Sequence, residues 1–128
     1  MANYADDMIV DKKDQLEKIE GMCLPEETIL AVFDLKGQGT GFLGITDKRL
    51  IFYDKEFMRK KKAVVSLPHY RIVSVASEDD SGVIIKKGFF VSDALTITPI
   101  GGEPKTFEFR GGEKAHQAHN IIMRLILK

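Results

Sequence analysis

The sequence has 128 residues, of which 44% are hydrophobic and 30% are charged, values typical of one globular domain with a modest core. Its 19 basic residues equal its 19 acidic residues, so no net charge attracts nucleic acid or an anionic membrane to the whole chain. The single cysteine excludes an internal disulfide framework and a multi-thiolate zinc site.

Neither a signal peptide nor a membrane-spanning segment is predicted. Residues 1–7 are acidic, whereas a signal peptide begins with a basic region. No apolar run approaches the roughly 18 residues that a membrane span needs. We therefore expect a cytoplasmic protein.

The first predicted element is a helix over residues 6–21. Acidic residues near its start suit the N-terminal end of a helix, and Gly21 is a natural end. Leu16 and Ile19 recur at helical spacing and form a narrow apolar stripe. Pro25 then breaks the helix, so residues 1–23 are predicted to be an N-terminal helical extension.

From residue 28 the apolar period changes from helical to two. Ile29, Ala31, Phe33 and Leu35 alternate with other side chains, which predicts a first strand with these four residues on one face.

The next segment, residues 41–54, predicts an antiparallel hairpin with its turn at Asp47 and Lys48. Alternate residues of its two strands supply one apolar face. They are Leu43, Ile45, Leu50 and Phe52.

Short strands separated by turns follow, and the chain then ends in a helix. The charged residues 55–62 are predicted to form a loop, and strands are expected at residues 63–67, 71–76, 83–86, 89–91, 94–98 and 105–110. Residues 113–127 have the apolar period of a helix. This predicts about seven core strands and one closing helix.

Three segments carry a resemblance to a known family. They are the Leu-Pro-Glu-Glu-Thr-Ile-Leu run at residues 24–30, the Gly-Ile-Thr-Asp-Lys-Arg-Leu-Ile-Phe run at residues 44–52, and residues 67–75. In these segments, and in the order of strands and helix, residues 24–128 resemble the bacterial pleckstrin-homology-like (PH-like) domains.

The resemblance implies a mainly β fold: a partly open seven-stranded barrel of two near-orthogonal antiparallel sheets, capped by a C-terminal helix. PH-like domains are binding modules for lipid headgroups, peptides or partner proteins, and bacterial members often self-associate. The family brings no catalytic residues to this chain. The PH-like domain is accordingly predicted over residues 24–128.

Residues 36–41 form a glycine-rich turn between the first two strands. In PH domains that bind phosphoinositides, this loop carries several Lys and Arg residues, whereas here Lys36 is the basic residue. The sequence therefore favours a hairpin connection over a phosphate clamp.

The strongest local basic run lies in the predicted loop. Its four cations beside two apolar side chains would contribute roughly 4 kcal/mol at an anionic membrane, which corresponds to binding near the millimolar range. The alternative is a solvated loop. The candidate membrane or anion contact consists of Lys36, Phe57, Met58, Arg59, Lys60, Lys61 and Lys62.

Phe89, Phe90 and Val91 form an apolar segment between turns. Strand alternation leaves one phenylalanine pointing outward, which makes this segment a candidate contact between copies of the chain. The alternative is a strand covered on both faces.

Histidines give a weaker hypothesis of metal binding or hydrolysis. Glu113, His116 and His119 can share one helix face, but zinc needs a further ligand. His69 would need a serine partner, for which Ser66 and Ser74 are the candidates, and no nucleophile motif is present.

We therefore expect a non-enzymatic PH-like binding module, without cofactor or metal, that contacts a partner protein or further copies of itself. The alternative is a peripheral domain that binds anionic membranes through the basic run.

Overall fold

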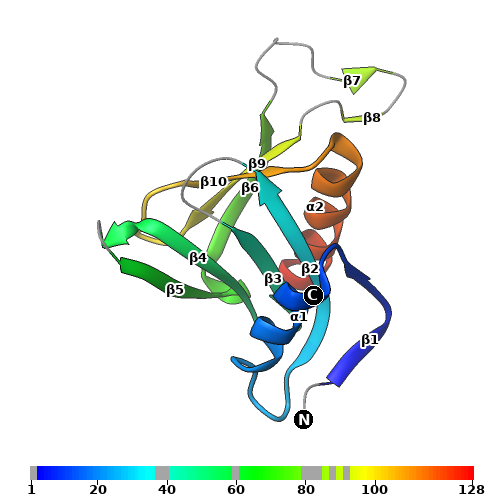
Figure 1. Ribbon diagram of the computed structural model, residues 1–128. Helices are drawn as coiled ribbons and strands as arrows, with labels where there is room; N and C mark the ends of the chain where they lie inside the picture. The colour runs from blue at the N-terminus through cyan, green and yellow to red at the C-terminus, as the bar shows by residue number, and fades with distance from the viewer. Residues whose placement is uncertain (1–2, 37–40, 59–60, 79–84, 87–88, 91–92) are drawn as a thin grey trace. The chain divides into compact units, whose positions relative to one another are not determined.

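The computed structural model describes residues 3–36, 41–58, 61–78, 85–86, 89–90 and 93–128 (Figure 1). The chain divides into two compact units, Met1–His69 and Tyr70–Lys128. Among the described residues, strands hold more residues than helices in both units, and each unit contains one α-helix. The short 3₁₀ helix η1 (His69–Arg71) joins the two units along the chain.

The first unit is a sheet with one helix packed on it. Its elements are β1 (Asn3–Val10), α1 (Lys13–Glu20), β2 (Thr28–Lys36), β3 (Phe42–Thr46), β4 (Arg49–Met58) and β5 (Lys61–Pro68). Within the sheet, the hydrogen-bonded order is β5–β4–β3–β2, and these neighbours are antiparallel. β1 lies alongside β2 and runs parallel to it.

The predicted hairpin is confirmed. β3 and β4 are antiparallel, and Asp47 and Lys48 connect them. Leu43 lies opposite Phe52 and Ile45 opposite Leu50, and all four side chains are buried. The predicted apolar face is therefore buried, and the opposite face is buried as well, since Phe42 of β3 and Ile51 of β4 are enclosed.

The prediction of a helix over residues 6–21 is wrong in its first part. β1 occupies the start of this segment, and α1 begins only at Lys13, although Gly21 does cap the helix as predicted. The β-branched residues Ile9 and Val10 favour a strand, and β2 offers them a hydrogen-bonding neighbour. Long-range pairing thus overrides the acidic residues that suggested a helix start.

β2 also differs from its predicted pattern. Its pairing with β3 shifts between Ile29 and Ala31, which indicates a β-bulge at Leu30. Because a shift of one residue reverses the faces of a strand, Ile29 joins Val32 in one cluster instead of sharing a face with Ala31. The predicted common face of Ile29 with the later residues is therefore wrong.

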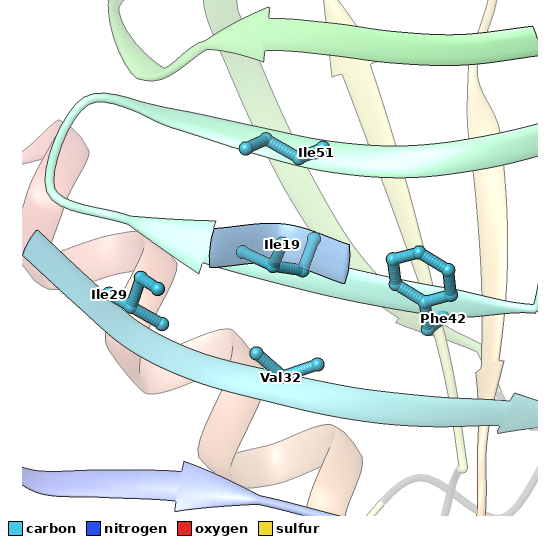
Figure 2. Close-up of a cluster of buried hydrophobic side chains, with 5 residues drawn as sticks. All are labelled: Ile19, Ile29, Val32, Phe42 and Ile51. Carbon is cyan, nitrogen blue, oxygen red and sulfur yellow. The ribbon is translucent and has the colours of Figure 1, made fainter. Parts of the chain in front are cut away.

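The N-terminal helix covers one face of the first sheet. Ile19 of α1 is fully buried in a cluster with Ile29, Val32, Phe42 and Ile51 (Figure 2). The helix approaches closely because Gly44 of β3 has no side chain: a β-carbon there would lie 2.9 Å from Ile19 Cγ1. The predicted stripe of Leu16 and Ile19 thus packs on the sheet of its own chain.

This close approach predicts the effect of a methyl group at Gly44. We expect Gly44→Ala to lower the free energy of unfolding by about 1–3 kcal/mol, because Ile19 is enclosed and must shift. Urea denaturation measures the change. In an Ile19→Ala background the same substitution should cost less, since the overlapping side chain is gone.

Gly41→Ala is the matched control, because a β-carbon at Gly41 would contact no other atom within 4 Å. An equal loss of stability in both glycine variants, or an unchanged cost of Gly44→Ala in the Ile19→Ala background, would contradict this explanation.

The predicted charged loop over residues 55–62 is wrong at both ends. β4 continues to Met58, and β5 already begins at Lys61, which lies opposite Met58. Pairing with a neighbouring strand therefore extends the hairpin through a segment whose charge had suggested a loop.

The second unit is a smaller antiparallel sheet with a helix. Its strands are β6 (Ile72–Glu78), β7 (Ile85–Lys86), β8 (Phe89–Phe90), β9 (Ala94–Pro99) and β10 (Lys105–Phe109), and they precede α2 (Gly112–Ile126). β9 lies between β6 and β10, and β7 pairs with β8.

Apolar residues of β9 and β10 form the core of this unit. Leu95 lies opposite Phe107, and Ile97 and Phe109 are also fully buried. α2 packs against this sheet and buries Ala118 and Ile122. Across the part of the chain that the structure describes, no helix is long and apolar enough to cross a membrane.

Candidate functional site

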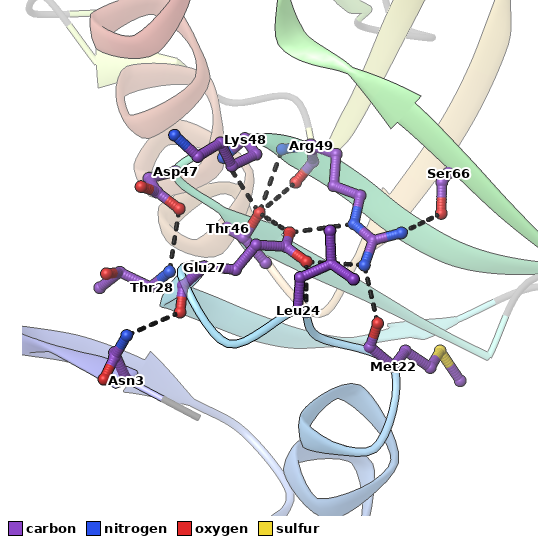
Figure 3. A network of polar contacts seen from close by, with 10 residues as sticks. All are labelled: Asn3, Met22, Leu24, Glu27, Thr28, Thr46, Asp47, Lys48, Arg49 and Ser66. Atoms are coloured by element: carbon purple, nitrogen blue, oxygen red, sulfur yellow. Dashed lines mark hydrogen bonds and ion pairs between the residues drawn. The ribbon is translucent and has the colours of Figure 1, made fainter. Parts of the chain in front are cut away.

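A buried ion pair organises the polar residues of the first unit. Glu27, at 1% exposure, precedes β2, and Arg49 begins β4. Arg49 donates two hydrogen bonds to the Glu27 carboxylate, from Nε at 2.9 Å and from Nη2 at 2.7 Å (Figure 3). This two-point contact is the strongest arrangement for an arginine and a carboxylate.

Three further groups complete the network around this pair. The Thr46 hydroxyl donates to Glu27 Oε2 at 2.7 Å, and the Leu24 backbone N–H donates to Oε1 at 2.8 Å. Arg49 also donates to the Met22 carbonyl oxygen at 2.7 Å. The network therefore joins the segment that follows α1 to the start of the β3–β4 hairpin.

The network fixes the charge state of Glu27. Burial alone would raise the pKa of its carboxyl group, but hydrogen bonds from Arg49, Leu24 and Thr46 outweigh burial and lower this pKa below its ordinary value. The hydrogen bond to Glu27 likewise raises the pKa of Arg49. Because both carboxylate oxygens accept hydrogen bonds, this glutamate is suited to holding the fold together and poorly suited to proton transfer.

Cys23 lies at the edge of the same region. Burial, followed by the nearby negative charge of Glu27, raises the pKa of its thiol. The side chain is half-buried and packs against the cluster around Ile19. It is therefore a small apolar residue with low reactivity, as the sequence predicted for a lone cysteine.

The His69 side chain makes a hydrogen bond within the fold. Its Nε2 lies 2.7 Å from the Thr46 carbonyl oxygen, and burial lowers its pKa, so the ring is neutral and donates this hydrogen bond. Ser66, one proposed partner, instead accepts a hydrogen bond from Arg49 Nη1 at 2.8 Å. His69 thus anchors the chain to the end of β3.

The histidines of α2 contact an asparagine. Asn120 Nδ2 lies 3.2 Å from His116 Nε2, and Asn120 Oδ1 lies 3.5 Å from His119 Nδ1. No group of three or more His, Cys, Asp or Glu side chains suited to a metal ion occurs among the described residues.

The predicted basic contact falls at the end of the β4–β5 hairpin. Phe57 and Met58 end β4, whereas Lys61 and Lys62 begin β5. Arg59 and Lys60 lie outside the described residues, as does most of the glycine-rich turn, residues 37–40. Lys36 is the last residue of β2.

The predicted contact between copies is described in part. Phe89 and Phe90 form β8, which pairs with β7, so that Phe90 lies opposite Ile85 and Phe89 opposite Lys86. Val91, and Gly88 where a bulge or turn was predicted, lie outside the described residues. The role of this segment stays a prediction.

Four large apolar side chains are exposed in the described part of the second unit: Leu127 at the end of α2, and three further residues that the sequence analysis did not single out. Tyr70 is 78% exposed, Val73 59% and Ile100 50%. We call these three residues the apolar patch. The Ile100 N–H donates to the Arg71 carbonyl oxygen at 2.7 Å, and Pro99 pairs with Ile72, so the segments that carry the patch lie side by side.

A turn with defined geometry presents one part of the patch. Ile100 lies in a turn that is closed by a hydrogen bond, in which the Gly102 N–H donates to the Pro99 carbonyl oxygen at 3.3 Å. Gly101, in the same turn, has φ +68°. A positive φ at this turn position favours glycine. The Pro-Ile-Gly-Gly run predicts a turn, but pairing of β6 with β9 is needed to place Ile100 near Val73.

Comparison with known proteins identifies the family. The family model described as "Bacterial PH domain" matches residues 24–123. The chain belongs to the bacterial PH domain family. A search of the curated proteins gives no match.

Solved bacterial PH domain structures share the fold. The pleckstrin homology domain from Shewanella amazonensis SB2B is 20% identical, with a TM-score of 0.64 over 92% of this chain and 100% of that one. A DUF1696 family protein with a pleckstrin-homology domain from Shewanella loihica PV-4 is 19% identical, with a TM-score of 0.63 over 90% of this chain and 93% of that one. The predicted mainly β PH-like fold with a C-terminal helix is therefore confirmed.

The ion pair predicts how stability depends on pH. Glu27→Gln keeps the shape of the side chain but leaves Arg49 without its counter-charge. We therefore expect the substitution to lower the free energy of unfolding by about 3 kcal/mol at pH 7, as measured by urea denaturation. Because the folded-state pKa of Glu27 is lowered, its contribution is complete above the unfolded pKa of about 4.3 and is lost as the pH falls through the folded value.

The difference in free energy of unfolding between wild type and Glu27→Gln should therefore become smaller at acid pH. Glu26→Gln is the control. Because the neighbouring Glu26 is exposed, this substitution should change the free energy of unfolding little. A Glu27→Gln protein as stable as wild type at pH 7 would contradict this role of the pair.

Proposed function

We propose that this bacterial PH domain is a non-enzymatic binding module that contacts protein partners and assembles with further copies of itself. The apolar patch of Tyr70, Val73 and Ile100 carries the proposal. Exposed apolar side chains that lie together mark contact surfaces, and tyrosine is enriched among the residues that dominate such contacts.

The buried polar residues also support the proposal, because their contacts hold the fold together. Glu27, Arg49 and His69 each make hydrogen bonds inside the fold. These groups are therefore assigned to stability, whereas the exposed surface of the second unit is assigned to binding.

Substitution within the apolar patch tests the proposal. We expect wild type to form a defined oligomer in size-exclusion chromatography with light scattering, and Ile100→Ser to shift it toward the monomer. Ile100 is half exposed, so its replacement should leave the monomer folded, as circular dichroism would show.

Leu127→Ser is the matched control, because Leu127 is an exposed apolar residue at the end of α2. A wild-type monomer throughout the accessible concentration range would refute self-association. Equal dissociation by both substitutions would remove the patch as its cause.

A second candidate function is binding to an anionic membrane. Met58 pairs with Lys61 across the β4–β5 hairpin, which brings the two ends of the basic run to the same end of the hairpin. The cations of a basic run at the end of a hairpin can approach a membrane surface at the same time. Each cation would then contribute about 1 kcal/mol to the free energy of binding. Phe57 and Met58 would have to add apolar contacts for useful affinity.

Vesicle sedimentation tests this second function. With vesicles containing phosphatidylserine, binding should be strongest at low salt and should fall when Lys60, Lys61 and Lys62 are all changed to Ala. Vesicles of phosphatidylcholine alone provide the uncharged control. If no protein sediments with the anionic vesicles even at low salt, the membrane function is excluded.

A further inference from the structure

β6 lies at the end of its sheet. Among the described residues it has a hydrogen-bonded strand neighbour on one side, β9, and the order of the sheet stops at β6. From Ser74 to Glu78 this pairing is regular, after a shift of register near Val73. In an antiparallel ladder, alternate residues of such a strand direct their backbone N–H and C=O groups away from the neighbour. This edge can therefore accept a further strand.

The composition of β6 does not protect this edge. Natural proteins guard terminal strands with lysine or proline. β5, at the end of the sheet in the first unit, begins with Lys61 and Lys62 and ends with Pro68. β6 reads Ile-Val-Ser-Val-Ala-Ser-Glu and contains neither lysine nor proline. Its Val73, Ser74 and Ala76 side chains are exposed.

The charges at the two ends of β6 indicate which strand would fit beside it. Exposed Arg71 directly precedes the strand, and Glu78 is its last residue. If a second β6 runs antiparallel to the first, the negative end of each strand lies beside the positive end of the other. If it runs parallel, like charges lie beside each other at both ends. The sequence of β6 is thus complementary to itself in the antiparallel sense.

We propose that two copies of this chain associate by antiparallel pairing of their β6 strands, with Arg71 of each copy near Glu78 of the other. This inference rests on the proposed function and names the surface that serves it. A two-fold axis near Val75, at the middle of β6, relates the copies. Val73 and Tyr70 lie at the start of the strand, so the same contact reaches the apolar patch.

Charge reversal tests this arrangement. Arg71→Glu and Glu78→Arg each place like charges at both ends of the paired strands. We expect each variant alone to raise the dimer dissociation constant by about tenfold in sedimentation-velocity measurements at low salt. An equimolar mixture of the two variants restores opposite charges at both ends, and should recover the wild-type dissociation constant in a mixed dimer.

A second pair of variants examines the strand itself. Ala76→Lys introduces a protecting lysine at an exposed position of β6, and should yield a folded monomer. Val64→Lys is the control, because Val64 is exposed on β5, where lysines are already present, and its dimer should persist.

The outcomes separate this inference from the proposed function. A wild-type oligomer that tolerates Ala76→Lys, or charge variants whose mixture associates no better than either one alone, overturns β6 pairing while leaving self-association intact. A monomeric wild type overturns both.

Discussion

The contact between Glu27 and Arg49 ties together parts of the first unit that are distant in the sequence. The carboxylate holds the turn before β2, while the guanidinium starts β4 and reaches back to the Met22 carbonyl oxygen. Neither charge could remain buried without the other, because an isolated ion in a protein interior costs several kcal/mol. The position of α1 therefore depends on a polar contact at its end as well as on Ile19, which is buried beside Gly44.

Local patterns in the sequence were enough to predict the β3–β4 hairpin and the C-terminal helix, and the resemblance to bacterial PH-like domains implied the fold. The alternating apolar residues of the hairpin are buried as their pattern predicts, but the pattern did not show that Phe42 and Ile51 on the opposite face are buried too. The prediction failed where a distant neighbour decides the conformation. β1 is a strand because β2 accepts it, and the bulge near Leu30 reflects pairing with β3.

The polar network around Glu27 and the apolar patch were harder to predict for the same reason. Glu27 and Arg49 are 22 residues apart, and nothing in their local sequence marks them as partners. Tyr70 and Ile100 are unremarkable in sequence until the pairing of β6 with β9 brings their segments together. The basic run was conspicuous in sequence because its residues are consecutive, yet its described residues belong to the two strands of a hairpin.

The protected state of Cys23 has a practical consequence for solution work on this protein. A thiol with a raised pKa forms little thiolate at neutral pH, and the thiolate is the species that reacts with maleimides, peroxides and disulfides. Half-buried against the cluster around Ile19, this sulfur atom is also a poor target for bulky reagents. A cysteine introduced at an exposed position can therefore be labelled selectively in the natural background, which permits fluorescence and spin-label distance measurements on this protein.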